Sequence, residues 1–285
     1  MMNIPVILAA TSKNFWEMVV YLIQVGGKDF LQGAGNTILL AVVGTAIGCL
    51  IGFLVGIVQT IPIQPQDSLI KKILLKIVRI FMSVYIEVFR GTPMIIQAVV
   101  IYYGSLAAFG IDMKAMLAGF VIISINTGAY MSESVRGGID SIDIGQTEAA
   151  KAIGMTHFQT MFSIVFPQAL RNILPQIGNN LIINIKDSSV LMIISVTELF
   201  YTTRTLAGTY YVTYEPYLIT CVIYLSMTFT CSRLLRWYER KIDGPDSYNL
   251  AGTNPKGPLV QNRRAAGVTM QMFNRKYNGQ RSAMR

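Results

Sequence analysis

Long apolar segments separated by short polar intervals run through most of this chain. A helix needs about 20 apolar residues to cross the roughly 30 Å hydrocarbon core of a bilayer. Several segments approach or reach that length, and the shorter ones still show helical periodicity. The pattern therefore predicts an all-α membrane protein with about five transmembrane helices. The predicted helices cover residues 36–58, 94–109, 114–135, 168–185 and 217–235.

Two further segments have the pattern of amphipathic helices. In residues 1–30, apolar side chains alternate with charged ones around Trp16, which predicts an N-terminal interfacial segment ending at Gly26 and Gly27. The second amphipathic helix covers residues 69–89. Its polar stripe consists of Lys72, Lys76, Arg79, Ser83 and Glu87.

The motif Arg90-Gly91-Thr92-Pro93 separates this amphipathic helix from the next apolar segment. Proline lacks a backbone N–H and disfavours the helical conformation at the residue before it, so the helix should break here. Arg90 is positioned to pair with Glu87. Further along, residues 190–196 are too short to span, which indicates a re-entrant or external element followed by an external loop with Glu198.

Glycines recur every fourth residue in the first predicted span, at Gly44, Gly48, Gly52 and Gly56. Residues four apart lie on one face of a helix, and small residues there let two helix backbones approach closely. We interpret this face as a packing surface for another helix, with no role in binding a substrate.

Polar side chains form one-sided stripes inside two of the other spans. Amides and carboxylates are costly in lipid, so these stripes should face the bundle interior or an aqueous path. Glu133 is the acidic member, and we predict that it accepts an ammonium or guanidinium group of a substrate. The alternative is a structural ion pair of Glu133 with Arg136 or Arg90. The candidate substrate-path residues are Asn126, Tyr130, Glu133, Gln176, Asn180 and Asn184.

Composition supports a membrane protein and limits its chemistry. The chain is 52% hydrophobic and 14% charged, whereas soluble domains carry about 25% charged residues. One histidine and isolated cysteines leave no metal-ligand set, and the phosphate-loop pattern G-x-x-x-x-G-K-[ST] is missing. We therefore expect this chain to bind no metal or cofactor, and ATP with Mg²⁺ to be bound by a partner chain if transport uses it.

The longest polar interval between two apolar segments predicts a helical hairpin at residues 143–166. Asp143 and Gln146 have the spacing of a helix N-cap and its partner, and Gly154 suits the left-handed position after a helix. Thr156 and Gln159 repeat the capping spacing, and Pro167 should close the unit. The hairpin has a surface of small residues to which another protein could bind.

This hairpin resembles the EAA loop of ABC-transporter permeases, and the flanking motifs resemble the histidine/glutamine-type permeases of polar amino-acid importers. The resemblance covers about residues 30–240, with Phe166 where leucine is usual and Ser188 where threonine is commoner. The matching segments are Glu148-Ala149-Ala150 with Gly154 and Ile164-x-x-Pro167; Phe89-Arg90-Gly91-Thr92-Pro93; Tyr130-x-x-Glu133-x-x-Arg136-Gly137-Gly138; Pro167-Gln168-Ala169-Leu170-Arg171; and Lys186-Asp187-Ser188-Ser189.

The resemblance implies the type I permease fold of ABC importers and a set of partners. These are an ATPase subunit, a second permease subunit that is either identical or homologous, and an external solute-binding protein. In that family the hairpin docks into a groove on the ATPase. The implied coupling residues are Glu148, Ala149, Ala150, Gly154, His157 and Phe158, and the implied structural motif comprises Arg90, Gly91, Thr92, Pro93, Pro167, Lys186, Asp187 and Ser188.

The distribution of basic residues predicts the orientation in a bacterial cytoplasmic membrane. Lys and Arg concentrate on the cytoplasmic side, and from Arg233 onward the chain has eleven Lys or Arg against three Asp or Glu. The N-terminus should lie outside and the C-terminus inside. The chain thus divides into an interfacial segment (1–30), a transmembrane permease domain (31–242) and a basic tail (243–285), which we expect to be disordered and to meet lipid headgroups rather than nucleic acid.

Three alternatives to an amino-acid permease remain open from the sequence. The first is an ABC permease for another small polar solute. The second is a membrane-embedded enzyme, which would need a catalytic set at membrane depth, such as the Ser188 and Lys186 couple. The third is a signalling or scaffold subunit, for which the polar stripes inside the spans would have no purpose.

Overall fold

The computed structural model describes residues 14–63 and 65–243, and these residues are helical apart from turns. The chain divides into two compact units, residues 1–239 and 240–285, of which the first contains the bundle described below. Because no strand occurs in the described residues, the all-α prediction is confirmed. The elements are α2 (Phe15–Thr60), α3 (Leu69–Gly91), α4 (Met94–Phe109), α5 (Ala115–Asp140), α6 (Ile144–Ala152), α7 (His157–Thr160), the π-helix η1 (Met161–Val165), α8 (Phe166–Asp187), the 3₁₀ helix η2 (Ser188–Ile194), α9 (Leu199–Tyr210) and α10 (Tyr214–Asp243).

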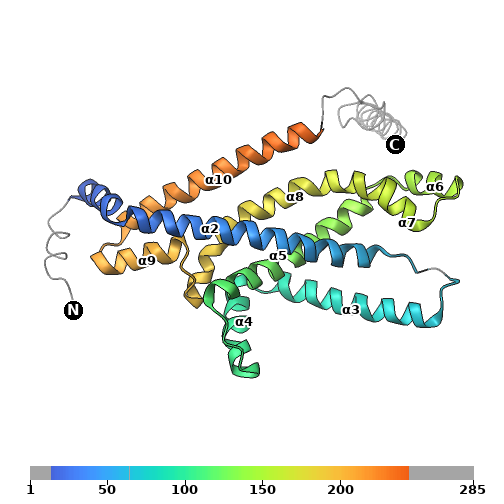
Figure 1. Cartoon of the computed structure of the whole chain (residues 1–285), viewed down its shortest axis with the longest axis horizontal. Helices are drawn as coiled ribbons and strands as arrows, with labels where there is room; N and C mark the ends of the chain where they lie inside the picture. The colour runs from blue at the N-terminus through green and yellow to red at the C-terminus, as the bar shows by residue number, and fades with distance from the viewer. Residues whose placement is uncertain (1–13, 64, 244–285) are drawn as a thin grey trace, which may run out of the picture. The chain divides into compact units, whose positions relative to one another are not determined.

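Helix length and composition identify the membrane-spanning elements of the described residues. Three helices, α2, α5 and α10, are long and apolar enough to cross a membrane, and the pair His157–Ile194 and Leu199–Tyr210, bent by 53°, makes a fourth if it is counted as one span. The helix α4 is apolar but shorter. These five apolar elements agree with the prediction of about five spans. Figure 1 shows α3, α5 and α8 running beside α2, while α4 points away from them.

The first helix is longer than the sequence pattern predicts. We expected an interfacial helix ending at Gly26 and Gly27, but α2 continues through both glycines as a single helix of 46 residues. Gly26 is buried, and a Cβ added there would lie 3.0 Å from Cδ1 of Leu206 in α9. This glycine therefore permits close packing instead of ending the helix. The first residues of the predicted interfacial segment, 1–13, lie outside the described residues.

The glycine face of α2 packs against α5, as the four-residue spacing predicts. Each glycine meets one residue of α5, and these partners also recur every four residues. Added Cβ atoms would lie 2.4–2.7 Å from the partner side chains, closer than real Cβ contacts allow. We call this contact the glycine seam. Its pairs are Gly44 with Ile123, Gly48 with Thr127, Gly52 with Met131, and Gly56 with Val135.

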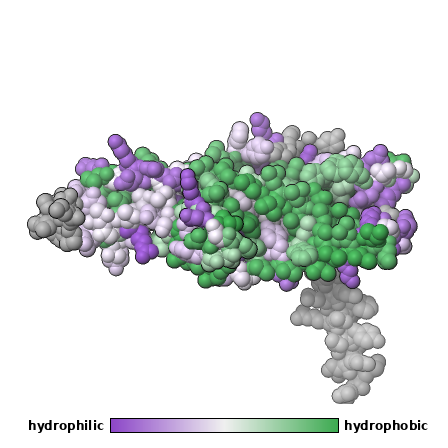
Figure 2. Space-filling model, turned by 60° about the horizontal axis from the view of Figure 1, so that its bottom comes forward, coloured by the Kyte–Doolittle hydropathy of each residue, from purple (hydrophilic) through white to green (hydrophobic). Residues whose placement is uncertain are grey.

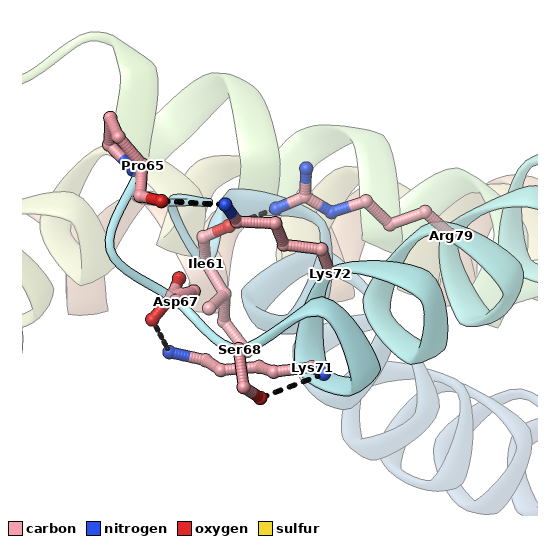
Figure 3. Close-up of polar contacts among 7 residues, drawn as sticks. All are labelled: Ile61, Pro65, Asp67, Ser68, Lys71, Lys72 and Arg79. Atoms are coloured by element: carbon pink, nitrogen blue, oxygen red, sulfur yellow. Dashed lines mark hydrogen bonds and ion pairs between the residues drawn. The ribbon is translucent and has the colours of Figure 1, made fainter.

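Basic side chains of the first half of α3 fold back onto the turn that follows α2 (Figure 3). Ser68 caps α3 by accepting from the Lys71 N–H. The other contacts are Lys71 Nζ to Asp67 at 2.6 Å, Lys72 Nζ to the Pro65 carbonyl at 2.7 Å, and the Arg79 guanidinium to the Ile61 carbonyl. Part of the predicted polar stripe of α3 thus fixes the α2–α3 turn.

The break between α3 and α4 lies where the proline motif predicts it. α3 ends at Gly91, Thr92 is extended, and Pro93 is the N-cap of α4. Gln97, which the sequence analysis did not select, holds the break together because its side-chain NH₂ donates to the Phe89 carbonyl at 2.8 Å and to the Thr92 carbonyl at 2.9 Å.

Two other predicted helix ends are wrong. α5 does not end at Arg136-Gly137-Gly138 but continues to Asp140, because Gly138 is buried and accommodates Ile173 of α8. Pro167 does not close the hairpin either. The π-helix η1 ends at Val165, two residues before Pro167, and α8 follows it directly from Phe166 and continues through Pro175.

The segment after α8 folds as η2, which is partly buried, and the helix α9 follows it where we expected an external loop. Leu191 and Ile194 of η2 are fully buried in a cluster with residues of α2, α4 and α5. Ser195 adopts φ +62° to turn the chain. Glu198, which we expected in an external loop, has 0% exposure and caps α9 by accepting from the Phe200 and Tyr201 N–H groups.

Candidate functional site

An open cavity of about 540 Å³ lies between α5 and α8, with Arg90 of α3 at its edge. Four of the six predicted substrate-path residues line it: Tyr130, Glu133, Gln176 and Asn180. They converge because the two predicted polar stripes, one on α5 and one on α8, face each other across the cavity. Asn179 and Asn172 of α8 also line it.

An ion pair between Arg90 and Glu133 occupies the cavity wall. The two side chains keep 38% and 36% of their surface exposed, so both remain accessible from the cavity. The Arg90 guanidinium also lies 5.5 Å from the centre of the Tyr130 ring, at cation–π distance. The sequence left Arg90 and Arg136 open as partners of Glu133, and the structure pairs Glu133 with Arg90. Arg90 thus pairs with Glu133 and not with Glu87.

Two predicted substrate-path residues do not reach the cavity. Asn126 donates to the Gln97 side chain at 2.9 Å and thereby joins α5 to the start of α4. Asn184 is buried and donates to the hydroxyls of Thr45 at 2.8 Å and Thr127 at 2.9 Å. A fully bonded amide in the core stabilises the bundle and is not available to a solute.

Asn172, which the sequence did not single out, donates to the Ser141 hydroxyl at 2.9 Å and thereby joins α8 to the C-terminal end of α5. Its signal was present, because Asn172, Gln176 and Asn180 follow the same four-residue spacing. Asn180 uses part of its amide internally, donating to the Gln176 carbonyl at 2.9 Å.

The predicted hairpin forms at the end of the bundle opposite α9 (Figure 1). The Asp143 side chain caps α6 by accepting from the Gly145 N–H at 2.7 Å, and the Gln146 N–H donates to the Asp143 backbone carbonyl at 3.0 Å. Gly154 has φ +83°, the left-handed conformation predicted for it. The capping box of Thr156 and Gln159 is confirmed, with bonds of 2.8 and 3.3 Å.

The hairpin exposes apolar side chains and buries one alanine. Ala150 is 1% exposed and anchors α6, whereas Glu148 and Ala149 face outward. Phe158 is 68% exposed and stacks on Phe162 with ring centres 4.4 Å apart. His157 is half-buried at the start of α7. An exposed aromatic pair is typical of a protein-binding surface.

The remaining motif residues have local structural roles. The Thr92 hydroxyl donates to the Val88 carbonyl at 2.7 Å at the end of α3. Ser188 is buried and donates to the Ile185 carbonyl at 3.0 Å, which shapes the turn into η2. Lys186 and Asp187 are exposed at the end of α8. Among the described residues, no group of three His, Cys, Asp or Glu is placed to hold a metal ion.

A helical membrane bundle with a polar cavity between its spans and an exposed hairpin at one end is the architecture of a membrane transport component. The family model "Binding-protein-dependent transport system inner membrane component" matches residues 73–244, and the chain belongs to this family. It is thus the permease subunit of an ABC importer, not an enzyme. The residues matched by the family model begin within α3 and include those of the cavity and of the hairpin.

Similar proteins agree with this family. The glutamine transport system permease protein GlnP of Escherichia coli is 34% identical over 74% of this chain and 92% of its own. The nopaline transport system permease protein NocM of Agrobacterium fabrum is 33% identical over 76% and 93%. A crystal structure of an amino acid ABC transporter with histidines matches with TM-score 0.69 and 35% identity over 80% of this chain and 99% of that one. The methionine transporter MetNI, at 19% identity and TM-score 0.57, shares the fold.

Proposed function

We propose that this permease imports polar amino acids. The observation that carries the proposal is the accessible Arg90–Glu133 pair in a cavity lined with amides. A zwitterion that leaves water needs a partner for each charge. Arg90 can bind the carboxylate of the solute, and Glu133 can bind its ammonium group. The two side chains then give up their contact with each other. The names of the relatives, for glutamine and for nopaline, support this class of substrate.

In this proposal the solute side chain is held by the amides of α8. Gln176 and Asn180 line the same cavity as the ion pair, and Asn179 is exposed beside them. Amides donate and accept hydrogen bonds, so they match polar side chains better than apolar ones. A cationic amino acid would gain most from Glu133, because its second positive charge also needs a counter-ion.

Transport is coupled to ATP hydrolysis through the hairpin at residues 143–166. The proposed contact surface is formed by Glu148, the left-handed turn at Gly154 and the exposed Phe158. The partner ATPase binds ATP and Mg²⁺, and its closure moves this hairpin and rocks the spans between two states. The hairpin end of the bundle then faces the cytoplasm, and the opposite end with α9 faces outward.

The orientation and the partners complete the proposal. The N-terminus lies outside and the C-terminus inside the bacterial cytoplasmic membrane, since basic residues are concentrated near the hairpin end and in the tail. A second permease subunit, identical or homologous, covers the open side of the cavity. An external solute-binding protein delivers the solute.

The test is uptake by the complete transporter in proteoliposomes, with a panel of radiolabelled glutamine, histidine, arginine and leucine. The unchanged complex should take up polar members in an ATP-dependent manner and exclude leucine. Glu133→Gln should shift the ratio of arginine to glutamine uptake towards glutamine, because the counter-ion for the second positive charge is lost. Glu87→Gln removes a carboxylate of α3 that does not line the cavity and serves as the matched control.

Two outcomes would contradict parts of this proposal. Uptake of no amino acid by the unchanged complex would reject the substrate class. An equal fall for every amino acid in Glu133→Gln, together with less assembled protein, would assign Glu133 a structural role.

A further inference from the structure

A second polar recess lies at the other end of the bundle, between α2 and α9. It has a volume of about 260 Å³. Three polar residues of α2, at positions one helical turn apart, form one wall, and hydroxyl-bearing residues of α9 form the other. The lining residues that matter here are Asp29, Gln32, Asn36, Thr202 and Thr205. None of them belongs to the proposed substrate cavity.

The walls of this recess are held in place. Gly33 lets α9 lie against α2, because a Cβ there would meet Thr202 Oγ1 at 2.8 Å and Leu199 Cα at 2.9 Å. The Asn36 amide donates to the Thr197 carbonyl at 2.6 Å and ties the start of α9 to α2. Glu198 caps α9 and accepts from the Tyr224 hydroxyl at 2.9 Å. A ligand would therefore meet a preformed site.

The recess is rich in hydrogen-bond acceptors, and most donors of the same side chains are already used. The Thr202 hydroxyl donates to the Glu198 carbonyl at 3.0 Å, and the Thr205 hydroxyl donates to the Tyr201 carbonyl at 3.0 Å. One N–H of the Asn36 amide is committed to the Thr197 carbonyl. These groups still offer lone pairs on two hydroxyl oxygens and on the Asn36 amide oxygen, which outnumber the one remaining Asn36 N–H.

Asp29 adds a carboxylate to these acceptors. The ion pairs found among the described residues are Lys71 with Asp67 and Arg90 with Glu133, so Asp29 has none there. The neighbouring cation on α9, Arg204, is directed to the sulfur of Met192 at 3.8 Å. A carboxylate surrounded by acceptors favours a ligand that brings positive charge and several N–H donors.

We propose that this recess receives a lysine or arginine side chain of the external solute-binding protein. The inference rests on the proposed function, because that function makes the α9 end the outer end. Two observations select this occupant. The recess lies at the opposite end of the bundle from the hairpin (Figure 1). Figure 2 shows that the surface towards this end is more hydrophilic than the broad hydrophobic band over the middle of the molecule. The family is defined by dependence on a binding protein.

The size of the recess also favours a single side chain. Its volume is about half that of the proposed substrate cavity, 260 against 540 Å³. The binding protein would insert one cationic side chain between α2 and α9. Because Glu198 links α9 to α10 through Tyr224, docking there also acts on the last span.

The experiment measures how the transporter's own purified binding protein stimulates ATP hydrolysis by the permease–ATPase complex in nanodiscs. Asp29→Asn should raise the concentration of binding protein needed for half-maximal stimulation by about three- to ten-fold at low salt, with basal hydrolysis unchanged. Asp29→Lys should raise it further. The difference from the unchanged complex should shrink as salt increases, because the lost contact is electrostatic.

Asp112→Asn is the matched control, since Asp112 is an exposed carboxylate in the turn between α4 and α5, outside the recess. It should leave half-maximal stimulation unchanged. A second measurement places the contact: Thr205→Cys should form a cross-link to a lysine of the binding protein through a short amine–thiol reagent, and Asp29→Lys should reduce its yield.

Several outcomes would overturn the inference. Unchanged half-maximal stimulation in Asp29→Asn would exclude a docking role for this carboxylate. Stimulation by free lysine or arginine without binding protein, abolished by Asp29→Asn, would make the recess a solute site instead. If the unchanged complex imports polar amino acids while Asp29→Asn behaves like it, only this inference fails; if the unchanged complex imports none, the proposed function fails.

Discussion

The helices α5 and α10 are both membrane-spanning by length and composition, yet they are held in the bundle in different ways. In the most apolar 18-residue stretch of each helix, 56% of the stretch is buried in α5, against 11% in α10. α5 is locked against α2 by the glycine seam, at four successive turns. α10 lacks such a seam and leaves Val222, Leu225 and Phe229 more than half exposed.

Polar and aromatic contacts near its first turns attach α10 to the bundle. The Thr220 and Thr203 hydroxyls bond to each other, and the Tyr224 hydroxyl donates to Glu198 at 2.9 Å. The Tyr217 ring lies 5.7 Å from that of Phe200. Towards its other end α10 approaches α8 where Leu235 meets Gly178.

This difference follows from the solvent. Inside a bilayer, apolar side chains gain little by leaving lipid, so helices associate through close packing and hydrogen bonds. The small residues of α2 supply close packing for α5, and the buried carboxylate Glu198 supplies a hydrogen bond for α10. α2 and α5 therefore form the closely packed part of the bundle, whereas α10 is attached to it mainly through a few polar and aromatic contacts.

The largest effect should come from breaking the glycine seam. In Gly52→Val the new Cβ would lie 2.4 Å from Met131 Cβ, so α2 and α5 must separate. We expect a loss of about 3 kcal/mol or more in the free energy of unfolding, measured by thermal unfolding in detergent. Gly35→Val is the control on the same helix, since nothing lies within 4 Å of its added Cβ. Equal stability of the two variants would contradict the rigid seam.

A smaller effect should follow from weakening the attachment of α10. Tyr224→Phe removes the hydrogen bond to Glu198 and should cost about 1–2 kcal/mol of stability. Amide hydrogen exchange should increase in the first half of α10 and not in α5. Tyr214→Phe changes a tyrosine that is 79% exposed near the same end and should leave both quantities unchanged. Faster exchange in α5 as well would show that the two helices are not independent.

The smallest effect is expected at the contact of α10 with α8. In Gly178→Ala the added Cβ would lie 3.0 Å from the end of the flexible Leu235 side chain, which can turn aside. Any cost should be balanced by the higher helix propensity of alanine, leaving a change within about 0.5 kcal/mol. Thermal unfolding of Gly178→Ala, measured in parallel with that of Gly52→Val, gives this change in stability. A loss as large as that of Gly52→Val would mean that α10 is locked as tightly as α5.

The sequence predicted the local features of this molecule well. The break at Pro93, the left-handed turn at Gly154 and the capping box of Thr156 each depend on a few neighbouring residues, and all three are confirmed. The glycine face of α2 was also predicted, but its partner was not. The spacing alone shows that one face of the helix carries small residues. It does not show which helix packs against that face.

The errors concern residues that often end helices. Gly26, Gly138 and Pro167 were interpreted as helix ends from their intrinsic preferences, but α2, α5 and α8 continue through or past them. In the first two cases another helix packs against the glycine, and in the third a π-turn accommodates the proline. Tertiary packing outweighed local propensity at the two glycines, whereas a local change of helix type accompanies the proline.

The sequence by itself determined the helical class, the spans and the two polar stripes, because these depend on composition and periodicity along one helix. The tertiary structure decided which polar residues share a cavity. Asn126 and Asn184 follow the same spacing as their neighbours but bond within the core. Glu133 and Arg90 come from different helices and meet there. Their meeting depends on how α3, α5 and α8 pack, and that packing is set by contacts between residues far apart in the chain.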